Sequence, residues 1–261
     1  MRKSIKSFVI LIMLLVLFVA CGSKNDNNSN TNGNLSSIES VKEAYSEAFE
    51  NSKTFTDVHS KITMNVSATT GGQTMDINYF SESWTRNGSS PELVEMKMSS
   101  VMEMFGMEFT FLVYAKDGVF YLDDGISKYI ISEADVANYS ANVDTNEVFD
   151  VINMSSDYSV RAVNGGQEIT FVIDKNAVLK LMKDSMSEDQ LDAVVVKELS
   201  GVVFINASGF VETTSITMEI DMEEQGVVVT TKTIIKIENE ILPSSYEFEF
   251  PDFSEFIDSP H

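Results

Sequence analysis

Few side chains in this 261-residue sequence belong to the types that carry out nucleophilic, acid–base or metal chemistry. The sequence has one cysteine, Cys21, and two histidines, His59 and His261. A zinc site needs several His or Cys ligands, so these counts argue against zinc. A His-based catalytic triad could use only His59, because His261 lies in the terminal tail. His59 sits among polar neighbours, and we expect a solvent-exposed surface imidazole.

The 40 acidic residues are the other source of chemistry. Asp123-Asp124, together with Asp221, Glu223 and Glu224, offers oxygen ligands for calcium, but the spacing of an EF-hand loop is absent. We expect a hydrated acidic surface there. Paired carboxylates for glycoside hydrolysis cannot be recognised among so many acids, and no glycine pattern typical of phosphate binding occurs. The sequence therefore predicts a protein that is not an enzyme and has no cofactor and no metal.

The first residues of the chain have the layout of an export signal. Arg2, Lys3 and Lys6 form a basic head, and residues 8–20 are an unbroken run of thirteen apolar residues. A run of this length falls short of the roughly 20 residues that span a bilayer. A secretory signal peptide over residues 1–20 is therefore predicted.

Residues 17–21, Leu-Phe-Val-Ala-Cys, resemble a bacterial lipobox, with Phe18 at a place where Leu is usual. The resemblance implies cleavage before Cys21 and attachment of acyl chains, such as palmitate, to this cysteine. The predicted location is the extracytoplasmic face of the cell membrane, with the acyl chains of Cys21 as the membrane anchor. The alternative is an ordinary signal peptide followed by an incidental cysteine.

The charge of the chain argues against nucleic acid as a partner. After residue 20, 15 basic and 40 acidic residues remain, which gives a net charge of −25. No Lys/Arg cluster follows Lys6, so no basic stripe could replace phosphate counterions. The same charge disfavours adsorption on anionic lipid. Residues 21–34, the lipidated cysteine and a polar Asn-rich stretch, are predicted to be a disordered tether.

Residues 35–261 are predicted to form one domain of long antiparallel strands with a few helices. Helices are expected from Ser37, from Asp174 with a restart near Ser187 that carries Leu191, Val194 and Val195, and between residues 132 and 152. Period-two alternation predicts an extended strand or hairpin over residues 93–107. It predicts strands over residues 58–66, 75–79, 109–113, 119–122, 158–163, 169–173, 202–222, 227–237 and 246–250.

Methionine is unusually frequent on one face of these strands. Twelve methionines follow residue 20, many of them at positions where β-branched residues are the usual choice. A methionine stripe is more often core, but flexible and polarizable side chains also suit a cavity that accepts acyl chains of varied shape. The candidate lining residues of such a cavity are Met96, Met98, Met102, Met104, Met218 and Ile220.

The order of elements over residues 35–250 resembles the family of bacterial lipoprotein carriers and sensors that includes LolA, LolB, LppX and RseB, and Gram-positive lipoproteins thought to share its fold. The resemblance rests on this pattern and includes no catalytic motif. It implies an α+β fold: a single curved antiparallel sheet, or half-barrel, covered on its concave face by helices. The enclosed space would hold acyl chains. One departure is Cys21, which would keep this protein at one membrane, whereas LolA is an unlipidated shuttle.

Two functions from different classes remain open. The first is a membrane-anchored lipoprotein that binds a lipid or other apolar small molecule in a methionine-rich cavity. The alternative is a non-enzymatic sensor or interaction module whose half-barrel is filled by its own side chains. Such a module would meet an envelope protein or a cell-wall partner through its acidic surface.

Overall fold

A computed structural model of the chain describes residues 38–52, 54–86, 94–131, 155–182, 191, 193–224 and 226–258. The predicted signal peptide, Cys21, the tether and the helix expected between residues 132 and 152 lie outside these ranges. Within the described ranges, every helix is too short or too polar to cross a lipid bilayer.

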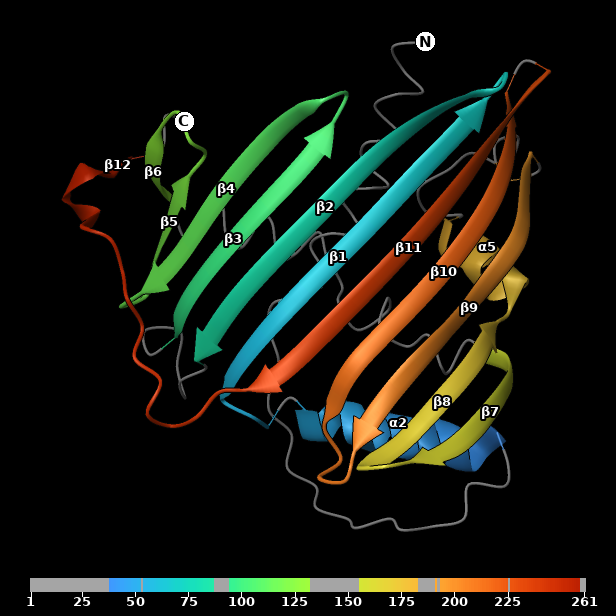
Figure 1. Cartoon of the computed structure of the whole chain (residues 1–261), viewed down its shortest axis with the longest axis horizontal. Helices are drawn as coiled ribbons and strands as arrows, with labels where there is room; N and C mark the ends of the chain where they lie inside the picture. Colours follow the sequence, from blue (N-terminus) through green and yellow to red (C-terminus); the bar gives the residue numbers. More distant parts are fainter. Residues whose placement is uncertain are drawn as a thin grey trace.

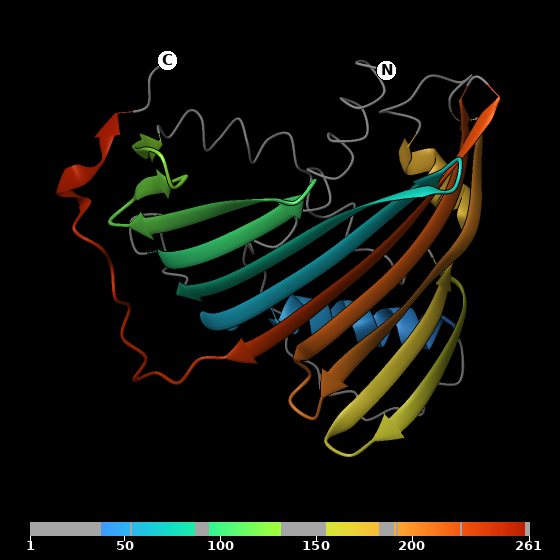
Figure 2. The same ribbon diagram turned by 45° about the horizontal axis from the view of Figure 1, so that its top comes forward.

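One large curved sheet organises the described residues (Figures 1 and 2). Its strands are β1 (Asp57–Thr70), β2 (Gln73–Arg86), β3 (Glu95–Met104), β4 (Met107–Lys116), β5 (Val119–Asp123), β6 (Lys128–Ile131), β7 (Ser155–Val163), β8 (Gly166–Ile173), β9 (Val194–Asn206), β10 (Val211–Glu224), β11 (Val227–Ile241) and β12 (Ile257–Asp258). They lie in the order β12-β6-β5-β4-β3-β2-β1-β11-β10-β9-β8-β7. The described part of the chain is therefore mostly β.

Nearly all neighbouring strands are antiparallel, because short hairpins join most of them. The hairpin between β1 and β2 turns at Gly71 and Gly72, whose φ angles of +56° and +80° suit glycine. The exception is β12, which pairs with β6 in parallel. The prediction of antiparallel pairing throughout is wrong there, because β12 arrives by a long connection that no hairpin constrains.

Helix α2 (Ile38–Ser52) covers part of the concave face of the sheet, behind β8 to β10 in Figure 1. Its apolar stripe of Val41, Tyr45 and Ala48 packs against concave residues of β8 and β9 such as Ile169 and Val203. Val41, Ile169 and Val203 are completely buried. This helix and its apolar stripe agree with the prediction from the sequence.

The C-terminal end of α2 is tied to the turn between β9 and β10. The Asn51 side chain donates hydrogen bonds to the carbonyl oxygens of Ser208 and Gly209, at 2.9 and 3.2 Å. The Ser52 hydroxyl accepts a hydrogen bond of 2.9 Å from the backbone N–H of Val211. These bonds satisfy backbone groups at the turn and fix the helix over this end of the sheet.

The second described helix, α5 (Lys175–Met182), begins where the sequence predicts. The Asp174 carboxylate accepts hydrogen bonds from the backbone N–H groups of Asn176 and Ala177, at 2.7 and 3.0 Å, which is N-capping geometry. The helical placement of Val194 and Val195 is wrong, because these residues begin β9. Three consecutive valines favour a strand over the helical spacing that the apolar pattern suggested.

The strand predicted over residues 246–250 is also wrong. This segment is extended but unpaired, and it belongs to a C-terminal strap, residues 246–256, that leads from β11 to β12 (Figure 2). Its alternation arises because aromatic side chains face the body of the protein while Glu247 and Glu249 face solvent. Phe248 lies 5.1 Å from the Arg86 guanidinium, and the ring of Phe253 stacks on Tyr121 at 3.8 Å.

Candidate functional site

The structure places the four candidate methionines of β3 on the concave face of the sheet. Met102 and Met104 pair with Tyr79 and Ile77 of β2, and both pack against a buried cluster that includes Met64. Met96 and Met98 follow on the same face, because side chains two residues apart in a strand point to the same side. We call the concave residues of β2 to β5 the concave methionine face.

Apolar side chains of β4 and β5 extend this face without a break. In the register of β3 with β4, Met102 pairs with Phe109, Ser100 with Phe111 and Met98 with Val113. Val113 in turn pairs with Leu122 of β5. Exposure increases toward the β3–β4 turn, from 9% for Met96 to 36% for Phe109 and 52% for Met107. The face therefore runs from a buried end to an open end.

The other two candidate residues lie elsewhere. Met218 and Ile220 occupy the concave face of β10, and β2, β1 and β11 lie between β10 and β3. Adjacent strands are about 4.8 Å apart, so four spacings place them roughly 19 Å from the methionines of β3. Both residues belong to the core beneath α2, where Ile220 is 8% exposed. The structure thus divides the six candidates into two groups.

A cluster of hydroxyl groups that was not predicted from the sequence lies within the concave methionine face. The Tyr79 hydroxyl donates a hydrogen bond of 3.1 Å to Ser100 Oγ, and Ser81 Oγ lies 2.9 Å from the same atom. We call these three residues the hydroxyl cluster. Strand alternation places Tyr79 and Ser81 on one face of β2, and Met98 and Ser100 on one face of β3, but which of them meet depends on the register between the two strands.

The concave face is uncharged over a wide area. In β1 to β6, the register places Asp, Glu, Lys, Arg and His on the opposite, convex face at every described position. A carboxylate or ammonium group bound there would lose its hydration without gaining a counter-charge. The chemistry of this surface is therefore that of an apolar site with a few hydroxyl groups.

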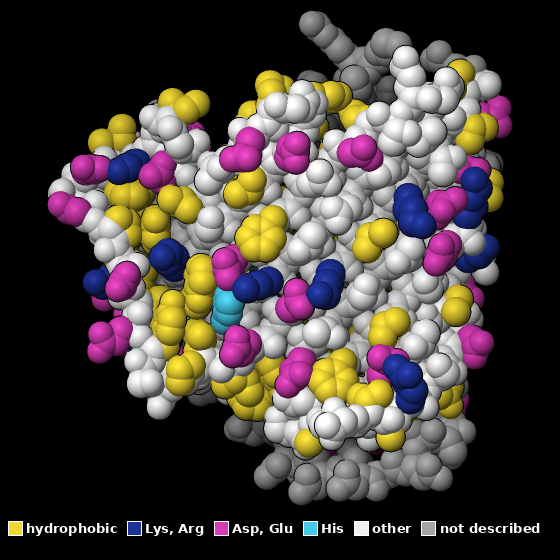
Figure 3. Space-filling view, in the orientation of Figure 1, with side chains coloured by type: hydrophobic (Ala, Val, Ile, Leu, Met, Phe, Trp, Pro, Cys, Tyr) yellow, Lys and Arg dark blue, Asp and Glu magenta, His cyan; other side chains and the backbone are white. Residues whose placement is uncertain are grey.

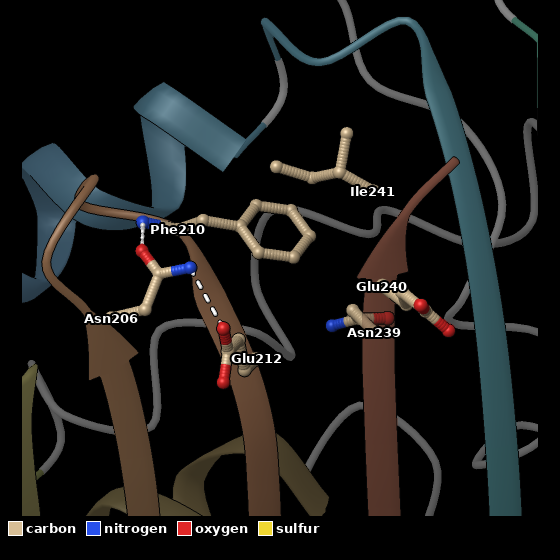
Figure 4. A pocket seen from close by; sticks show the side chains of 6 residues that line it. All are labelled: Asn206, Phe210, Glu212, Asn239, Glu240 and Ile241. Atoms are coloured by element: carbon tan, nitrogen blue, oxygen red, sulfur yellow. Dashed lines mark hydrogen bonds between the residues drawn. The ribbon is translucent and has the colours of Figure 1, made fainter. Parts of the chain in front are cut away.

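A cavity of about 330 Å³ lies outside this face, at the end of β9, β10 and β11 (Figure 4). Asn206 Nδ2 donates a hydrogen bond of 2.8 Å to Glu212, and Asn239 Nδ2 donates one of 3.1 Å to the Val211 carbonyl. The side-chain amides of Asn206 and Asn239 thus donate hydrogen bonds to oxygen atoms of the protein itself. The lining residues are Asn206, Phe210, Glu212, Asn239, Glu240 and Ile241.

The convex face carries charged side chains of both signs side by side (Figure 3). Two of the acids considered as calcium ligands bind groups of the protein itself. Asp124 Oδ1 accepts hydrogen bonds from the backbone N–H groups of Ile126 and Ser127, and Asp221 Oδ2 lies 2.7 Å from Lys197 Nζ. Among the described residues, no three His, Cys, Asp or Glu side chains come together in a way that could hold a metal ion.

His59 is held on the convex face more tightly than the sequence suggested. Its ring stacks on Trp84 with centroids 4.8 Å apart, and Nε2 lies 2.8 Å from Glu82 Oε1. Only 14% of its side chain is exposed, so the expectation of a solvent-exposed imidazole is wrong. Lys97 Nζ lies 5.5 Å from the Trp84 ring centroid. His59 therefore joins β1 to β2 rather than standing free.

We expect Glu82 to make stability depend on pH. Burial alone would raise the pKa of Glu82, but hydrogen bonds from His59 and Lys61 outweigh it and hold the pKa below its usual value of 4.5. The resulting stabilisation is present above pH 4.5 and is lost as the pH falls through the lowered pKa. Urea unfolding between pH 7 and pH 3 measures the free energies of unfolding of wild type and Glu82→Gln, and their difference should become smaller as the pH falls. A difference independent of pH would contradict it.

The sequence matches no protein-family model and no curated protein. Among solved structures, LprF from Mycobacterium bovis is similar over 75% of this chain and 91% of its own, with 10% identity and a TM-score of 0.35. A domain from Vibrio parahaemolyticus assigned to outer membrane lipoprotein sorting is similar over 81% and 95%, with 12% identity and a TM-score of 0.27.

Proposed function

We propose that this protein is a membrane-anchored extracytoplasmic lipoprotein that holds a lipid or other apolar ligand against the concave methionine face. The observation that supports it most is the continuous, uncharged apolar surface of β2 to β5. The described helix α2 packs over β7 to β10 instead. Each CH₂ of an acyl chain buried on such a surface contributes about 0.8 kcal/mol.

Three methionines of this face are less buried than the core residues beneath α2. Under α2, Val203 and Ile169 are completely buried, as expected of a filled core. On β3, Met98, Met102 and Met104 are only half-buried. Methionine has three rotatable bonds and a polarizable sulfur, so it can adapt to a ligand surface at little cost in rotamer strain.

The anchor belongs to the same proposal and rests on the lipobox resemblance of residues 17–21. Acyl chains on Cys21 would hold the chain at the membrane, and 13 tether residues would span roughly 20 Å. Native mass spectrometry of the chain purified from its own membrane in a non-ionic detergent tests both parts. A mass that fits the uncleaved, unacylated sequence would contradict the anchor, whereas a co-purifying apolar molecule would support the site.

Tryptophan substitution separates a ligand surface from a filled core. In Met98→Trp and Met102→Trp, the larger ring should occupy space meant for ligand, so that the thermal midpoint holds while binding of a fluorescent acyl-chain probe falls. Met218→Trp is the matched control, because this residue packs against the core beneath α2. Extra volume in that core is expected to cost about 1 to 3 kcal/mol of stability.

The opposite pattern would favour the alternative function. If the two β3 variants lose as much stability as Met218→Trp, and wild type shows no saturable probe binding, the concave methionine face is a filled core. The protein would then be a sensor or interaction module that meets an envelope or cell-wall partner through its acidic surface.

A further inference from the structure

The hydroxyl cluster on the concave methionine face has one hydrogen more than its own bonds use. Tyr79, Ser81 and Ser100 carry three O–H groups, and two hydrogen bonds join them. Each bond uses one hydrogen, whichever hydroxyl donates it. Among the described residues, one hydroxyl hydrogen of the cluster is therefore left without an acceptor.

This spare donor is deeply buried. Ser81 and Ser100 are 2% and 3% exposed, and Tyr79 is 9% exposed. Burying a hydroxyl hydrogen without an acceptor costs free energy, because the donor loses its hydrogen bond to water, and such donors are rare in native proteins. An acceptor from a bound molecule would complete the cluster.

The surroundings of the cluster define what kind of acceptor it can take. Ser100 pairs with Phe111 of β4, and Met98 and Met102 lie two residues to either side of it on the same face. The concave positions from β1 to β6 carry no charged side chain at any described position. A carboxylate would be desolvated here without a counter-charge, whereas a neutral carbonyl oxygen needs only one donor.

We propose that the hydroxyl cluster of Tyr79, Ser81 and Ser100 donates a hydrogen bond to an uncharged oxygen of the bound lipid, such as an ester carbonyl. The site thereby selects neutral ester lipids over free fatty acids. This inference rests on the proposed function, because it names the class of ligand that the concave methionine face would take.

Displacement of a fluorescent acyl-chain probe from the full chain in a non-ionic detergent measures the selectivity. The competitors are methyl palmitate, palmitate and hexadecane at pH 8, where palmitate is ionised. We expect methyl palmitate to bind about fivefold more tightly than hexadecane, the effect of one net hydrogen bond. Palmitate should bind at least about tenfold more weakly than its methyl ester, because its charge must be desolvated.

A variant without the hydroxyl groups isolates their effect. The triple variant Tyr79→Phe, Ser81→Ala and Ser100→Ala removes donors and acceptors together, so no unpaired partner remains. It should bind hexadecane like wild type and lose the fivefold preference for the ester. Ser99→Ala is the control, because Ser99 lies on the same strand but on the convex face, and it should keep the preference.

A spectroscopic measurement on wild type covers the case in which the triple variant fails to fold. The infrared carbonyl stretch of bound methyl palmitate labelled with ¹³C should lie at lower frequency than in hexane, as a hydrogen-bonded carbonyl does. An unshifted stretch, or equal binding of ester and hexadecane by wild type, would overturn the inference but leave apolar binding intact. Failure of wild type to bind any competitor would instead refute the proposed function itself.

Discussion

Replacing Phe171 by alanine is expected to lower the free energy of unfolding by about 3 to 5 kcal/mol, the range for removing a buried aromatic ring. Phe171 is 1% exposed in the core beneath α2. Its ring lies over Gly201 of β9, where the Cβ atom of any larger residue would come within 2.3 Å of the Phe171 ring. The ring therefore fills a space that the neighbouring strand leaves open for it, and its loss creates a cavity.

Chemical unfolding of Phe171→Ala and Val172→Ala tests this expectation. Val172 is the next residue of β8 but is 45% exposed, so its truncation should change stability by less than about 0.5 kcal/mol. Similar losses for the two variants would show that Phe171 is not part of a close-packed core. Loss of stability by Phe171→Ala without loss of probe binding would further show that the core beneath α2 and the concave methionine face are separate.

Phe256→Ala is expected to cost about 3 kcal/mol, because it removes the buried anchor of the C-terminal strap. Phe256 is 6% exposed, and its ring meets Tyr121 and Tyr114 edge to face with centroids 5.3 and 6.5 Å apart. Burial also raises the pKa of the Tyr114 hydroxyl above its ordinary value, which is consistent with a covered site. Loss of the ring should therefore release the strap from β4 and β5.

Amide hydrogen exchange reads out this release locally. Protection should fall in β5, β6 and β12 of Phe256→Ala and remain unchanged in β8 and β9. Ile257→Ala is the control, since this neighbour is 62% exposed and contributes to β12 mainly through its backbone. Unchanged protection of β6 in Phe256→Ala would mean that the strap does not depend on this ring.

Most strands and the beginnings of both described helices could be predicted from the sequence, because local rules act there without competition. Alternation assigned Met64, Met102 and Phe111 to the apolar face, and the cap at Asp174 marked the start of α5. The prediction of a strand over residues 246–250 of the strap is wrong for a physical reason. A chain that lies on a protein surface alternates apolar and polar side chains as a half-buried strand does, so residues 246–250 carry the pattern without the ladder.

The candidate site shows where reasoning from the sequence ends. Alternation identifies the face that Met98 and Met218 occupy but not the distance between their strands, which depends on the strand order. Pairing of Ser81 with Ser100 likewise depends on register between β2 and β3. His59 was misjudged because its stacking on Trp84 crosses from β1 to β2.

The parallel pairing of β12 with β6 has a consequence for how molecules meet one another. An open edge strand presents unpaired N–H and C=O groups that can pair with a strand of another molecule. Strand β6 would be prone to such pairing if it were open, because three of its four residues are the apolar Tyr129, Ile130 and Ile131. The two residues of β12 pair with Tyr129 and Ile130, which are half of the residues of β6. The opposite edge, β7, instead carries exposed Asp157 and Arg161. The sheet is thus guarded at both ends against edge-to-edge fibre growth, by a short covering strand at one and by charge at the other.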